Sequence, residues 1–372
     1  MLRLRRLWLR AFRNYDRAEL LLGGGITAFI GPNAAGKSNL LEAIYLVATG
    51  RSHRTVHEAE AIRFGETSAR VRALVTRRGR DEELEITLAA DQGKPTSQMR
   101  VNGAVTPRGS VLGRLPVVLA APWDLDVVRG PAAGRRRMLN GALAQLSPSY
   151  HFALHRYHRV VAQRNAELRR RSPGGLEPWD AQMVELGVRL TAHRREYVRR
   201  LAPQASAWFG HLGGLGALGA AYRAVWEGPG DEELADVARA QMAGCRADEF
   251  RRGVTLTGPH RDDVDLTLDG VPLRACGSLG QWRTAMLALR LAERAVMGDD
   301  LGASPVLLLD DALTELDHER QGRLLDLDDE AQVLLSATTL PGGGSPGRPR
   351  CVFSVAGGTI REAEWSPRSE RS

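Results

Sequence analysis

Apolar and polar residues alternate over the first twelve positions, and this pattern predicts a β-strand at the start of the chain. Leu2, Leu4, Leu7 and Leu9 are separated mostly by arginines, as expected of a strand with one buried face. A second apolar segment, residues 26–30, is short and uninterrupted, which is typical of a strand buried on both faces. The chain therefore begins with two strands of different kinds.

The period of the pattern changes at Ser38. Apolar residues then recur at intervals of three and four positions, which predicts a helix. They are Leu40, Leu41, Ile44, Tyr45 and Val47. A strand, a glycine-containing loop and a helix thus follow one another.

Strand patterns return between residues 68 and 120 and again after residue 263. Asn102-Gly103 and Asp269-Gly270 each follow an alternating segment, and both dipeptides are typical of two-residue hairpin turns. Residues 306–309 are all apolar, so we expect a buried strand there.

Residues 131–252 have a different character, because long helical patterns alternate with glycine-rich segments. We expect helices at residues 135–146, 150–171, 179–201 and 231–245. This helical lobe interrupts an α/β lobe, which would consist of residues 1–130 and 253–372. Residues 341–349 are expected to be a flexible loop and residues 366–372 a frayed tail.

Length and composition narrow the class of protein. The chain has 372 residues, of which 43% are hydrophobic, enough for a sizeable core in each of two lobes. No segment approaches the roughly eighteen uninterrupted apolar residues of a membrane helix. Three well-separated cysteines offer neither a disulfide framework nor a paired zinc motif. We expect a soluble, cytoplasmic protein without a membrane partner.

The loop after the second strand fits the phosphate-loop pattern G-x-x-x-x-G-K-[ST] in full. In such a loop, backbone N–H groups converge on phosphate oxygens, the lysine reaches the terminal phosphates and the serine holds magnesium. We therefore predict a nucleotide site that also includes the next residue, Asn39. The loop residues are Gly31, Pro32, Asn33, Ala34, Ala35, Gly36, Lys37 and Ser38.

The lysine of this loop is unusual in its own chain. The sequence has 49 arginines but only two lysines, Lys37 and Lys94. A planar guanidinium would not fit between phosphates in a loop of this size, whereas a compact ammonium does. The retained lysine at position 37 therefore supports nucleotide binding, while the net charge of +7 is weak support for a nucleic-acid partner because arginine is enriched throughout.

Two carboxylates, Asp310 and Asp311, follow the predicted strand at 306–309. A central parallel strand delivers such groups to the sheet edge where the phosphate loop opens. We predict that Asp310 orients Mg²⁺ and that Asp311 polarises the attacking water, with Lys37 as the third catalytic residue.

Ser278 and Gln281 have the spacing of a capping box at the start of a helix. Together with Gly280 they leave free N–H groups that can bind an anion. The motif order is phosphate loop, S-x-G-Q helix start, acidic strand end and then the segment Thr314 to Asp317, and this order resembles that of ABC-type ATPases.

The resemblance implies an ATP-dependent dimer. In that class, the S-x-G-Q segment of one subunit completes the ATP site of the other, so Ser278, Gly280 and Gln281 would contact the partner's ATP. Asp317 would belong to the loop that crosses the dimer contact. The resemblance also implies an ABC-type P-loop ATPase head with mixed sheets and flanking helices, into which the helical lobe is inserted.

Several strings are similar to those of the RecF family of bacterial recombination mediators, and the similarity spans residues 1 to about 340. The phosphate loop and Ser278 are 247 residues apart, too far for transporter ATPase domains and too close for SMC proteins with long coiled coils. The strings are residues 12–15, 50–55, 130–131 with 135–137, 257–263 and 281–284.

The RecF resemblance implies a slow Mg²⁺-dependent ATPase for DNA repair and replication. Such a protein recognises gaps or single-strand/double-strand junctions and, with RecR and RecO, helps to load RecA. Arg13 and Asn14 would help to hold the nucleotide. His260 and Arg261 could face nucleotide, magnesium or the seam between lobes, and the sequence does not choose among these.

The chain departs from the RecF or ABC pattern at a few positions. His53 stands where RecF proteins commonly have an aromatic residue, and Leu279 replaces a small or polar residue. Asp311 is shorter than the glutamate of most transporters, which implies slow turnover. The usual switch histidine is absent after residue 333, where Thr338 could sense phosphate more weakly.

Positive charge is concentrated in the predicted helical lobe. Residues 131–200 contain fourteen arginines and five acids, a net charge of +9, whereas the other 302 residues have a net charge of −2. We expect DNA to follow the arginine clusters, although solvated helix faces would have the same pattern. The clustered residues are Arg135, Arg136, Arg137, Arg169, Arg170, Arg171, Arg194, Arg195, Arg199 and Arg200.

Other functions remain open from the sequence. A P-loop kinase with a helical lid would explain the loop and the lobe, but would leave Ser278 to Gln281 without a purpose. Another SMC-like ATPase, a transporter subunit, or an ATP-sensing DNA scaffold that never hydrolyses ATP are further alternatives.

Overall fold

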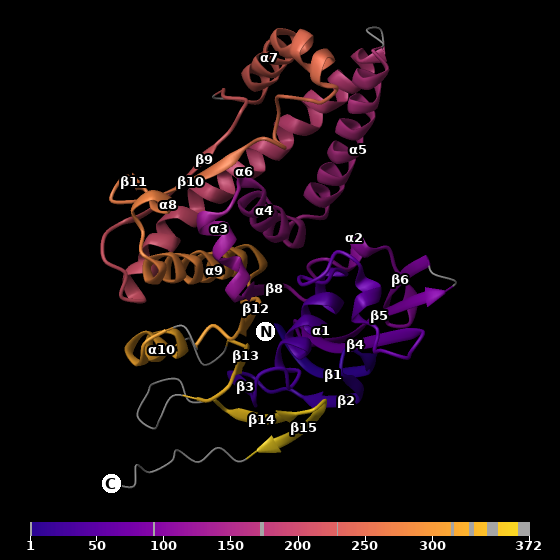
Figure 1. Ribbon diagram of the computed structural model, residues 1–372, viewed down its shortest axis with the longest axis vertical. Helices are drawn as coiled ribbons and strands as arrows, with labels where there is room; N and C mark the ends of the chain where they lie inside the picture. The colour runs from indigo at the N-terminus through magenta and orange to yellow at the C-terminus, as the bar shows by residue number, and fades with distance from the viewer. Residues whose placement is uncertain are drawn as a thin grey trace. The chain divides into compact units, whose positions relative to one another are not determined.

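Two compact units make up the chain (Figure 1). The first unit comprises the described parts of residues 1–124, 208–215 and 286–372, and the second comprises those of 125–207 and 216–285. The computed structural model describes residues 2–91, 94–171, 175–228, 230–313, 316–326, 331–340 and 349–363.

A six-stranded antiparallel sheet in the first unit has the order β2-β1-β4-β5-β6-β7. Alternate leucines of β1 are buried, and a bulge between Leu4 and Arg6 resets the alternation. Asn102 and Gly103 both have positive φ between β6 and β7, which confirms the predicted hairpin turn. The strands are β1 (Leu2–Phe12), β2 (Tyr15–Leu21), β4 (Ser68–Arg77), β5 (Arg80–Asp91), β6 (Lys94–Val101) and β7 (Ala104–Val105).

A second six-stranded sheet of this unit, in the order β15-β14-β3-β13-β12-β8, is parallel except for the edge strand β15. Its central strands are short, and every residue of β12 and β13 is buried, as expected of a sheet covered on both faces. The strands are β3 (Ile26–Ile30), β8 (Val117–Ala120), β12 (Val306–Asp310), β13 (Val333–Ala337), β14 (Cys351–Ala356) and β15 (Thr359–Ala363).

Helix α1 (Lys37–Thr49) packs Leu40, Leu41 and Ile44 into one core with residues of both six-stranded sheets. This shared core fixes the direction in which the start of α1 points. The other helical segments assigned wholly to the first unit are η1 (Glu58–Ala61), α2 (Arg108–Val111), η2 (Pro122–Asp124) and α10 (His318–Leu325).

The second unit is mostly helical. Its helices begin and end with the expected signals: Ser147 caps α5 by accepting a hydrogen bond from the Tyr150 N–H, and α7 ends at Gly253, whose φ is +67°. The helices are α3 (Leu125–Arg129), α4 (Ala132–Leu146), α5 (Pro148–Arg170), α6 (Glu177–His211), α7 (Asp231–Arg252), α8 (Leu273–Cys276) and α9 (Leu279–Leu301), of which α6 and α9 continue into the first unit.

A three-stranded sheet completes the second unit and corrects the predicted boundary at residue 252. β10 (Asp263–Leu268) pairs with β9 (Leu218–Arg223) and with β11 (Val271–Pro272). Residues 253–285 therefore belong with the helices rather than with the first unit. The sequence predicted β10 and its turn at Asp269-Gly270, but it missed β9 because glycines dilute the strand pattern there.

Helix α6 is longer than predicted, since it continues past Pro203 to His211. Among the described helices, none combines the length and the apolarity needed to cross a bilayer. Cys245, Cys276 and Cys351 are all free thiols.

Candidate nucleotide site

The phosphate loop connects β3 to α1 at the centre of the parallel sheet. Two of its glycines are required by close contacts: a Cβ at Gly31 would lie 2.1 Å from the Val355 carbonyl oxygen, and one at Gly36 would lie 2.5 Å from Asn14 Nδ2. Gly36 also has φ +116°, a conformation that side chains disfavour. The loop is therefore tightly wound by its surroundings, while Pro32 to Ala34 remain exposed.

Lys37 lies back along its own loop. Its Nζ donates hydrogen bonds of 3.0 Å to the carbonyl oxygens of Gly31 and Pro32, and the residue is only 4% exposed. The ammonium group is thus held against the backbone of its own loop.

Ser38 and Asp310 are in direct contact. Ser38 Oγ donates a 2.7 Å hydrogen bond to Asp310 Oδ1, and Ser336 Oγ donates a 2.6 Å bond to the same oxygen. The parallel register of β12 and β13 places Asp310 beside Ser336. The first turn of α1 and the end of β12 therefore share one cluster of oxygen atoms.

This cluster fits a divalent cation. Asp310 Oδ2 is buried and has no hydrogen-bond partner among the described residues, and burial raises the pKa of this carboxyl. Mg²⁺ prefers oxygen ligands such as hydroxyls and carboxylates, and a cation beside Asp310 would offset the cost of burying its charge. Ser38 and Asp310 are the residues that would hold it.

Asp311 follows directly and leaves the strand in a left-handed conformation, with φ 48°. Its N–H donates a 2.9 Å hydrogen bond to Ser336 Oγ. Left-handed non-glycine residues are uncommon and often occur at functional sites. Ser336 thus bridges the two acidic residues, although no motif in the sequence includes it.

Asn14 and Tyr15 support the loop from outside. Asn14 Nδ2 donates to the Ala35 carbonyl oxygen at 2.9 Å, and Tyr15 Oη donates to that of Gly36 at 3.0 Å. Asn39 Nδ2 in turn donates to Asn14 Oδ1 at 2.8 Å. Asn14 and Asn39, both predicted to bind nucleotide, therefore contact each other and the loop backbone. Tyr15 was missed as a supporting residue.

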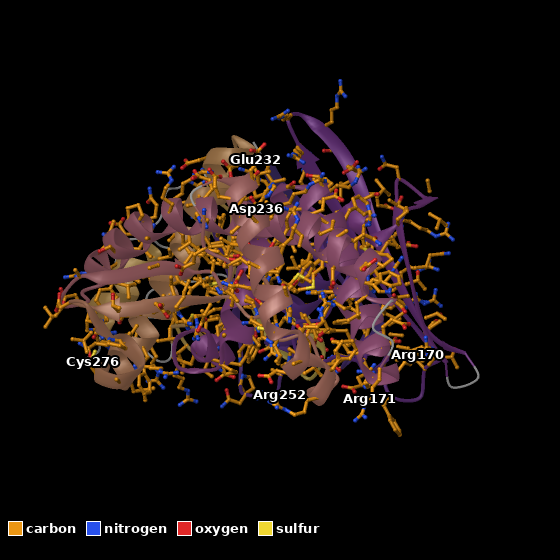
Figure 2. All side chains as sticks on the ribbon, turned by 90° about the horizontal axis from the view of Figure 1, so that it is seen from above. Arg170, Arg171, Glu232, Asp236, Arg252 and Cys276 are labelled. Atoms are coloured by element: carbon orange, nitrogen blue, oxygen red, sulfur yellow. The ribbon has the colours of Figure 1, made fainter. Side chains whose placement is uncertain are left out.

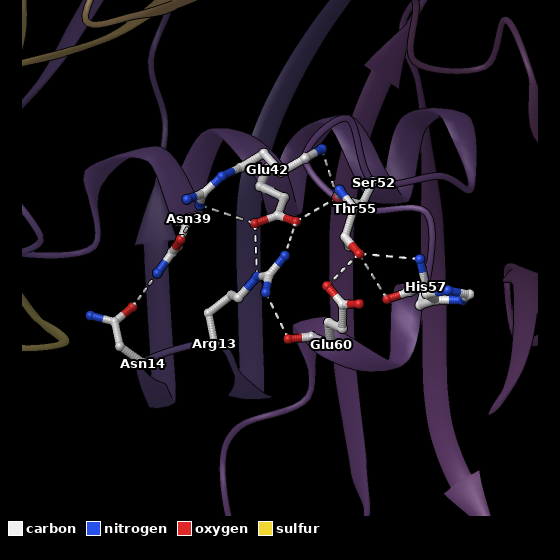
Figure 3. Close-up of polar contacts among 9 residues, drawn as sticks. Arg13, Asn14, Asn39, Glu42, Ser52, Thr55, His57 and Glu60 are labelled. Carbon is white, nitrogen blue, oxygen red and sulfur yellow. Dashed lines mark hydrogen bonds and ion pairs between the residues drawn. The ribbon is translucent and has the colours of Figure 1, made fainter. Parts of the chain in front are cut away.

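Arg13 is bound to a buried carboxylate, Glu42 of α1 (Figure 3). The guanidinium donates to both Glu42 oxygens, at 2.9 and 2.6 Å, and to the Glu60 carbonyl oxygen at 2.7 Å. Glu42 is completely buried and also accepts a 2.5 Å bond from Ser52 Oγ. Burial alone would raise the pKa of Glu42. The combined effect of Arg13, Ser52 and Arg54 in the opposite direction is larger, so the pKa is lowered from its usual value.

Arg54 links this pair to the phosphate loop. Its Nη1 donates to Asn39 Oδ1 at 2.6 Å and lies 3.4 Å from Glu42 Oε2. Its positive charge also lowers the pKa of Asp310, against the larger effect of burial. Glu42, Ser52 and Arg54 were not predicted as site residues, although Ser52 and Arg54 lie in the string at residues 50–55.

His53 stands at a position where an aromatic residue is expected, and its imidazole ring packs against two aromatic side chains. It stacks on Trp123 with a centroid distance of 5.4 Å and meets the edge of Tyr45 at 5.2 Å. Burial lowers its pKa to about 4, so the ring is neutral at pH 7. The substitution at this position is therefore compatible with packing.

The S-x-G-Q segment forms the predicted capping box. Ser278 N–H donates to Gln281 Oε1 at 2.8 Å, and Gln281 N–H donates to Ser278 Oγ at 3.3 Å. Ser278 and Leu279 are exposed, and Gly280 and Gln281 are half-buried. This turn belongs to the second unit and the phosphate loop to the first.

Asp317 caps α10 by accepting a 2.9 Å hydrogen bond from the Arg320 N–H, and it is exposed. Thr314 and Glu315, which complete the predicted dimer-contact segment, lie outside the described residues, as do residues 341–348 and the predicted tail. Thr338 follows β13 directly and is half-buried.

Two of the ten arginines predicted to contact DNA are in the interior of the second unit, which corrects that prediction. Arg135 makes a two-bond ion pair with Asp263, at 2.7 and 2.9 Å. Arg194 is 1% exposed, donates to the Pro259 carbonyl oxygen at 2.7 Å and lies 3.6 Å from Asp262. Their charges are already paired, so neither can follow a phosphate backbone.

The other eight arginines are exposed or half-buried. Arg170 and Arg171 are exposed at the end of α5, and Arg252 is exposed at the end of α7 (Figure 2). Arg169 is exposed as well. The Arg169 side chain lies against Gly253, so these two helix ends are neighbours. The same end of the unit thus carries exposed positive charge from two helices.

His260 faces the interior of its own unit. Its Nδ1 is 2.8 Å from Tyr157 Oη, its Nε2 is 3.3 Å from the Thr255 carbonyl oxygen, and burial lowers its pKa to about 4. Arg261 is exposed and donates to the same carbonyl oxygen at 3.1 Å. These contacts shape the loop that leads into β10.

Comparison with known proteins shows the family of the chain. The family model described as "RecF/RecN/SMC N terminal domain" matches residues 3–339. The DNA replication and repair protein RecF of Symbiobacterium thermophilum is 42% identical over 329 residues, 86% of each chain. The same-named protein of Thermosynechococcus vestitus is 39% identical over 368 residues, 96% of each chain.

Solved structures show the same fold. The recombination mediator protein RecF-ATP in the RecFOR pathway aligns with a TM-score of 0.89 at 27% identity, covering 98% of both chains. The Smc head domain derived from Pyrococcus furiosus aligns with a TM-score of 0.59 at 17% identity, covering 98% of this chain and 97% of the other. The fold is thus that of an ABC-type ATPase head with an inserted helical lobe.

Proposed function

This chain belongs to the RecF family of DNA replication and repair proteins, and we propose that it acts as an ATP-controlled clamp on DNA. The contact between Ser38 and Asp310 carries this proposal, because it joins the phosphate loop to the acidic strand end. Family membership argues against the kinase and transporter alternatives.

The residues around the loop divide the work of ATP hydrolysis. Backbone N–H groups of the loop and the Lys37 ammonium bind the phosphates, and Ser38 and Asp310 are the residues that would hold Mg²⁺, which would neutralise phosphate charge. Asp311 orients the attacking water and accepts its proton. An aspartate reaches less far than a glutamate, so hydrolysis is slow.

ATP controls whether two copies associate. The helix start at Ser278 is an exposed turn in which the capping box takes up the N–H groups of Ser278 and Gln281. The Ser278 hydroxyl and the N–H groups of Leu279 and Gly280 bind the γ-phosphate held by the other copy. Gly280, Gln281 and Asp317 complete this contact. Loss of the γ-phosphate on hydrolysis removes the shared ligand, so the copies separate.

DNA is the partner of the dimer. The protein recognises gaps or single-strand/double-strand junctions and, together with RecR and RecO, places RecA on single strands. The family relationship supports these assignments, and the exposed arginines at the ends of α5 and α7 supply a phosphate-binding surface.

Phosphate release measured with gapped DNA tests the proposed hydrolysis. Wild-type protein should release phosphate slowly from Mg²⁺-ATP, and Asp311→Asn should not, while both bind ATP. Exposed Asp236→Asn is the matched control and should behave as wild type. If wild type releases no phosphate, the protein is an ATP-sensing scaffold instead.

A further inference from the structure

Three arginines lie side by side on neighbouring strands on the solvent-facing side of the antiparallel sheet; we call them the arginine row. The strand register places Arg10 of β1 directly opposite Arg17 of β2 and directly opposite Arg70 of β4. All three are exposed. Like charges directly opposite each other destabilise a sheet, so this arginine row needs an explanation beyond the stability of the fold.

The neighbouring row of residues on the same face of the sheet shows that the high arginine content of the chain does not by itself explain the arginine row. There Glu19, Trp8, Arg72 and Glu85 lie side by side across four strands, so charges of opposite sign alternate. In the arginine row, Arg70 has a distant partner in Glu85 at 3.8 Å. Arg10 and Arg17 make no ion pair or side-chain hydrogen bond with any residue that the structure describes.

The row lies beside a hollow in the surface. The hollow has a volume of about 400 Å³ and is lined by side chains that include Trp8, Glu19, Arg72 and the arginine row. The guanidinium groups of Arg6 and Arg72 lie 4.9 and 4.8 Å from the centre of the Trp8 ring. Both guanidinium groups also have acidic partners, Arg6 in Glu19 and Arg72 in Glu83 at 3.7 Å. Among the described residues, the unpaired positive charge at the hollow is therefore that of Arg10 and Arg17.

We propose that the arginine row and the hollow bind the sugar–phosphate backbone of DNA. Arginine donates paired hydrogen bonds to phosphate, and phosphates between the three guanidinium groups would remove their mutual repulsion. A run of one sign suits a polyanion in which every repeat is negative, whereas protein surfaces usually present both signs. The inference rests on the proposed DNA binding and adds a contact surface in the first unit.

The test is the salt dependence of binding to a labelled duplex that contains a single-stranded gap, measured with ATP. Each phosphate contact contributes about 0.9 to the slope of log K against log salt concentration. Arg10→Gln combined with Arg17→Gln should therefore lower that slope by about 2, and Arg70→Gln alone by about 1. ATP binding should stay unchanged, since none of these residues contacts the phosphate loop.

The matched control replaces two exposed arginines at the far end of the same sheet: Arg78→Gln in the turn after β4, combined with Arg80→Gln at the first position of β5. It changes net charge equally and should leave the slope within about 0.5 of wild type. A double variant at positions 10 and 17 whose slope matches this control would overturn the inference. A wild-type protein that binds no DNA would instead overturn the proposed function.

Discussion

Ser38 and Asp310 are joined by a 2.7 Å hydrogen bond although 272 positions separate them in the chain. The order β3-β13-β12 in the parallel sheet explains this contact, because the loop after β3 and the end of β12 open at the same edge. Phosphate binding and cation binding are thereby built from the two ends of the sequence. Because the Asp310 carboxylate joins the phosphate loop to the end of β12, replacing it should change both the stability of the fold and ATP hydrolysis.

Replacing Asp310 by asparagine should raise stability in Mg²⁺-free buffer while abolishing hydrolysis. Burial raises the pKa of Asp310 in the folded protein, so the folded state binds this proton more tightly and stability falls as pH rises above the unfolded pKa. Removing the charge should add about 1 kcal/mol, or about 2 °C in Tm. Scanning calorimetry at pH 7 with EDTA measures this change.

The exposed Asp326 provides the matched control, and Asp326→Asn should change Tm by less than about 1 °C. Mg²⁺-ATP should stabilise wild type more than ATP with EDTA does, and this difference should vanish in Asp310→Asn. An Asp310→Asn protein that still hydrolysed ATP with Mg²⁺ would rule out Asp310 as a cation ligand.

Replacing Glu42 by glutamine should destabilise the first unit and weaken ATP binding. The change leaves Arg13 and Arg54 without their shared carboxylate, and breaking a buried ion pair costs about 3–5 kcal/mol. The pKa of Glu42 is lowered in the folded state. The stabilisation that its carboxylate provides is therefore present above the unfolded pKa of about 4.3 and is lost as pH falls through the folded pKa. The stability difference should therefore shrink in acid.

Urea unfolding at pH 7 and at pH 3 measures both effects, with the exposed Glu66→Gln as the control. That control should cost less than about 0.5 kcal/mol at either pH. Equal stability of Glu42→Gln and wild type at pH 7 would show that the carboxylate does not hold the two arginines.

Local signals predicted much of the fold. Turn dipeptides, the apolar strand at 306–309 and the capping box at Ser278 each depend on residues close together in sequence, and the structure contains all three. The contacts of the arginines could not be predicted in this way. Arg135 pairs with Asp263, 128 positions away, and no local pattern distinguishes it from the exposed Arg137, two positions later.

The site shows the same division. Motif residues such as Lys37 and Asp310 follow from short patterns, whereas Glu42 lies in an ordinary helical segment and acquires its role only through Arg13 and Arg54. The glycine-diluted strand β9 was missed as well, because its pairing partners in β10 lie 40 to 50 positions away, from Arg223 with Asp263 to Leu218 with Leu268.

Arg194 and Arg199 on α6 offer a matched pair for the corrected DNA surface. The Arg194 side chain is 1% exposed and paired in the interior, whereas that of Arg199 is 70% exposed and, among the residues that the structure describes, pairs only with Glu196, three positions away. Arg194→Gln should lower the free energy of unfolding by about 3–5 kcal/mol, and Arg199→Gln by less than about 0.5 kcal/mol. Chemical denaturation followed by circular dichroism measures both.

The association state in ATP tests the central claim most directly. Sedimentation velocity should show a monomer without nucleotide and with ADP, and a dimer with ATP under conditions of slow hydrolysis. Lys37→Met should stay monomeric because it does not bind ATP, and Ser278→Arg should bind ATP yet stay monomeric. If Ser278→Arg still forms the ATP-dependent dimer, the capped helix does not join the two copies and the account is wrong.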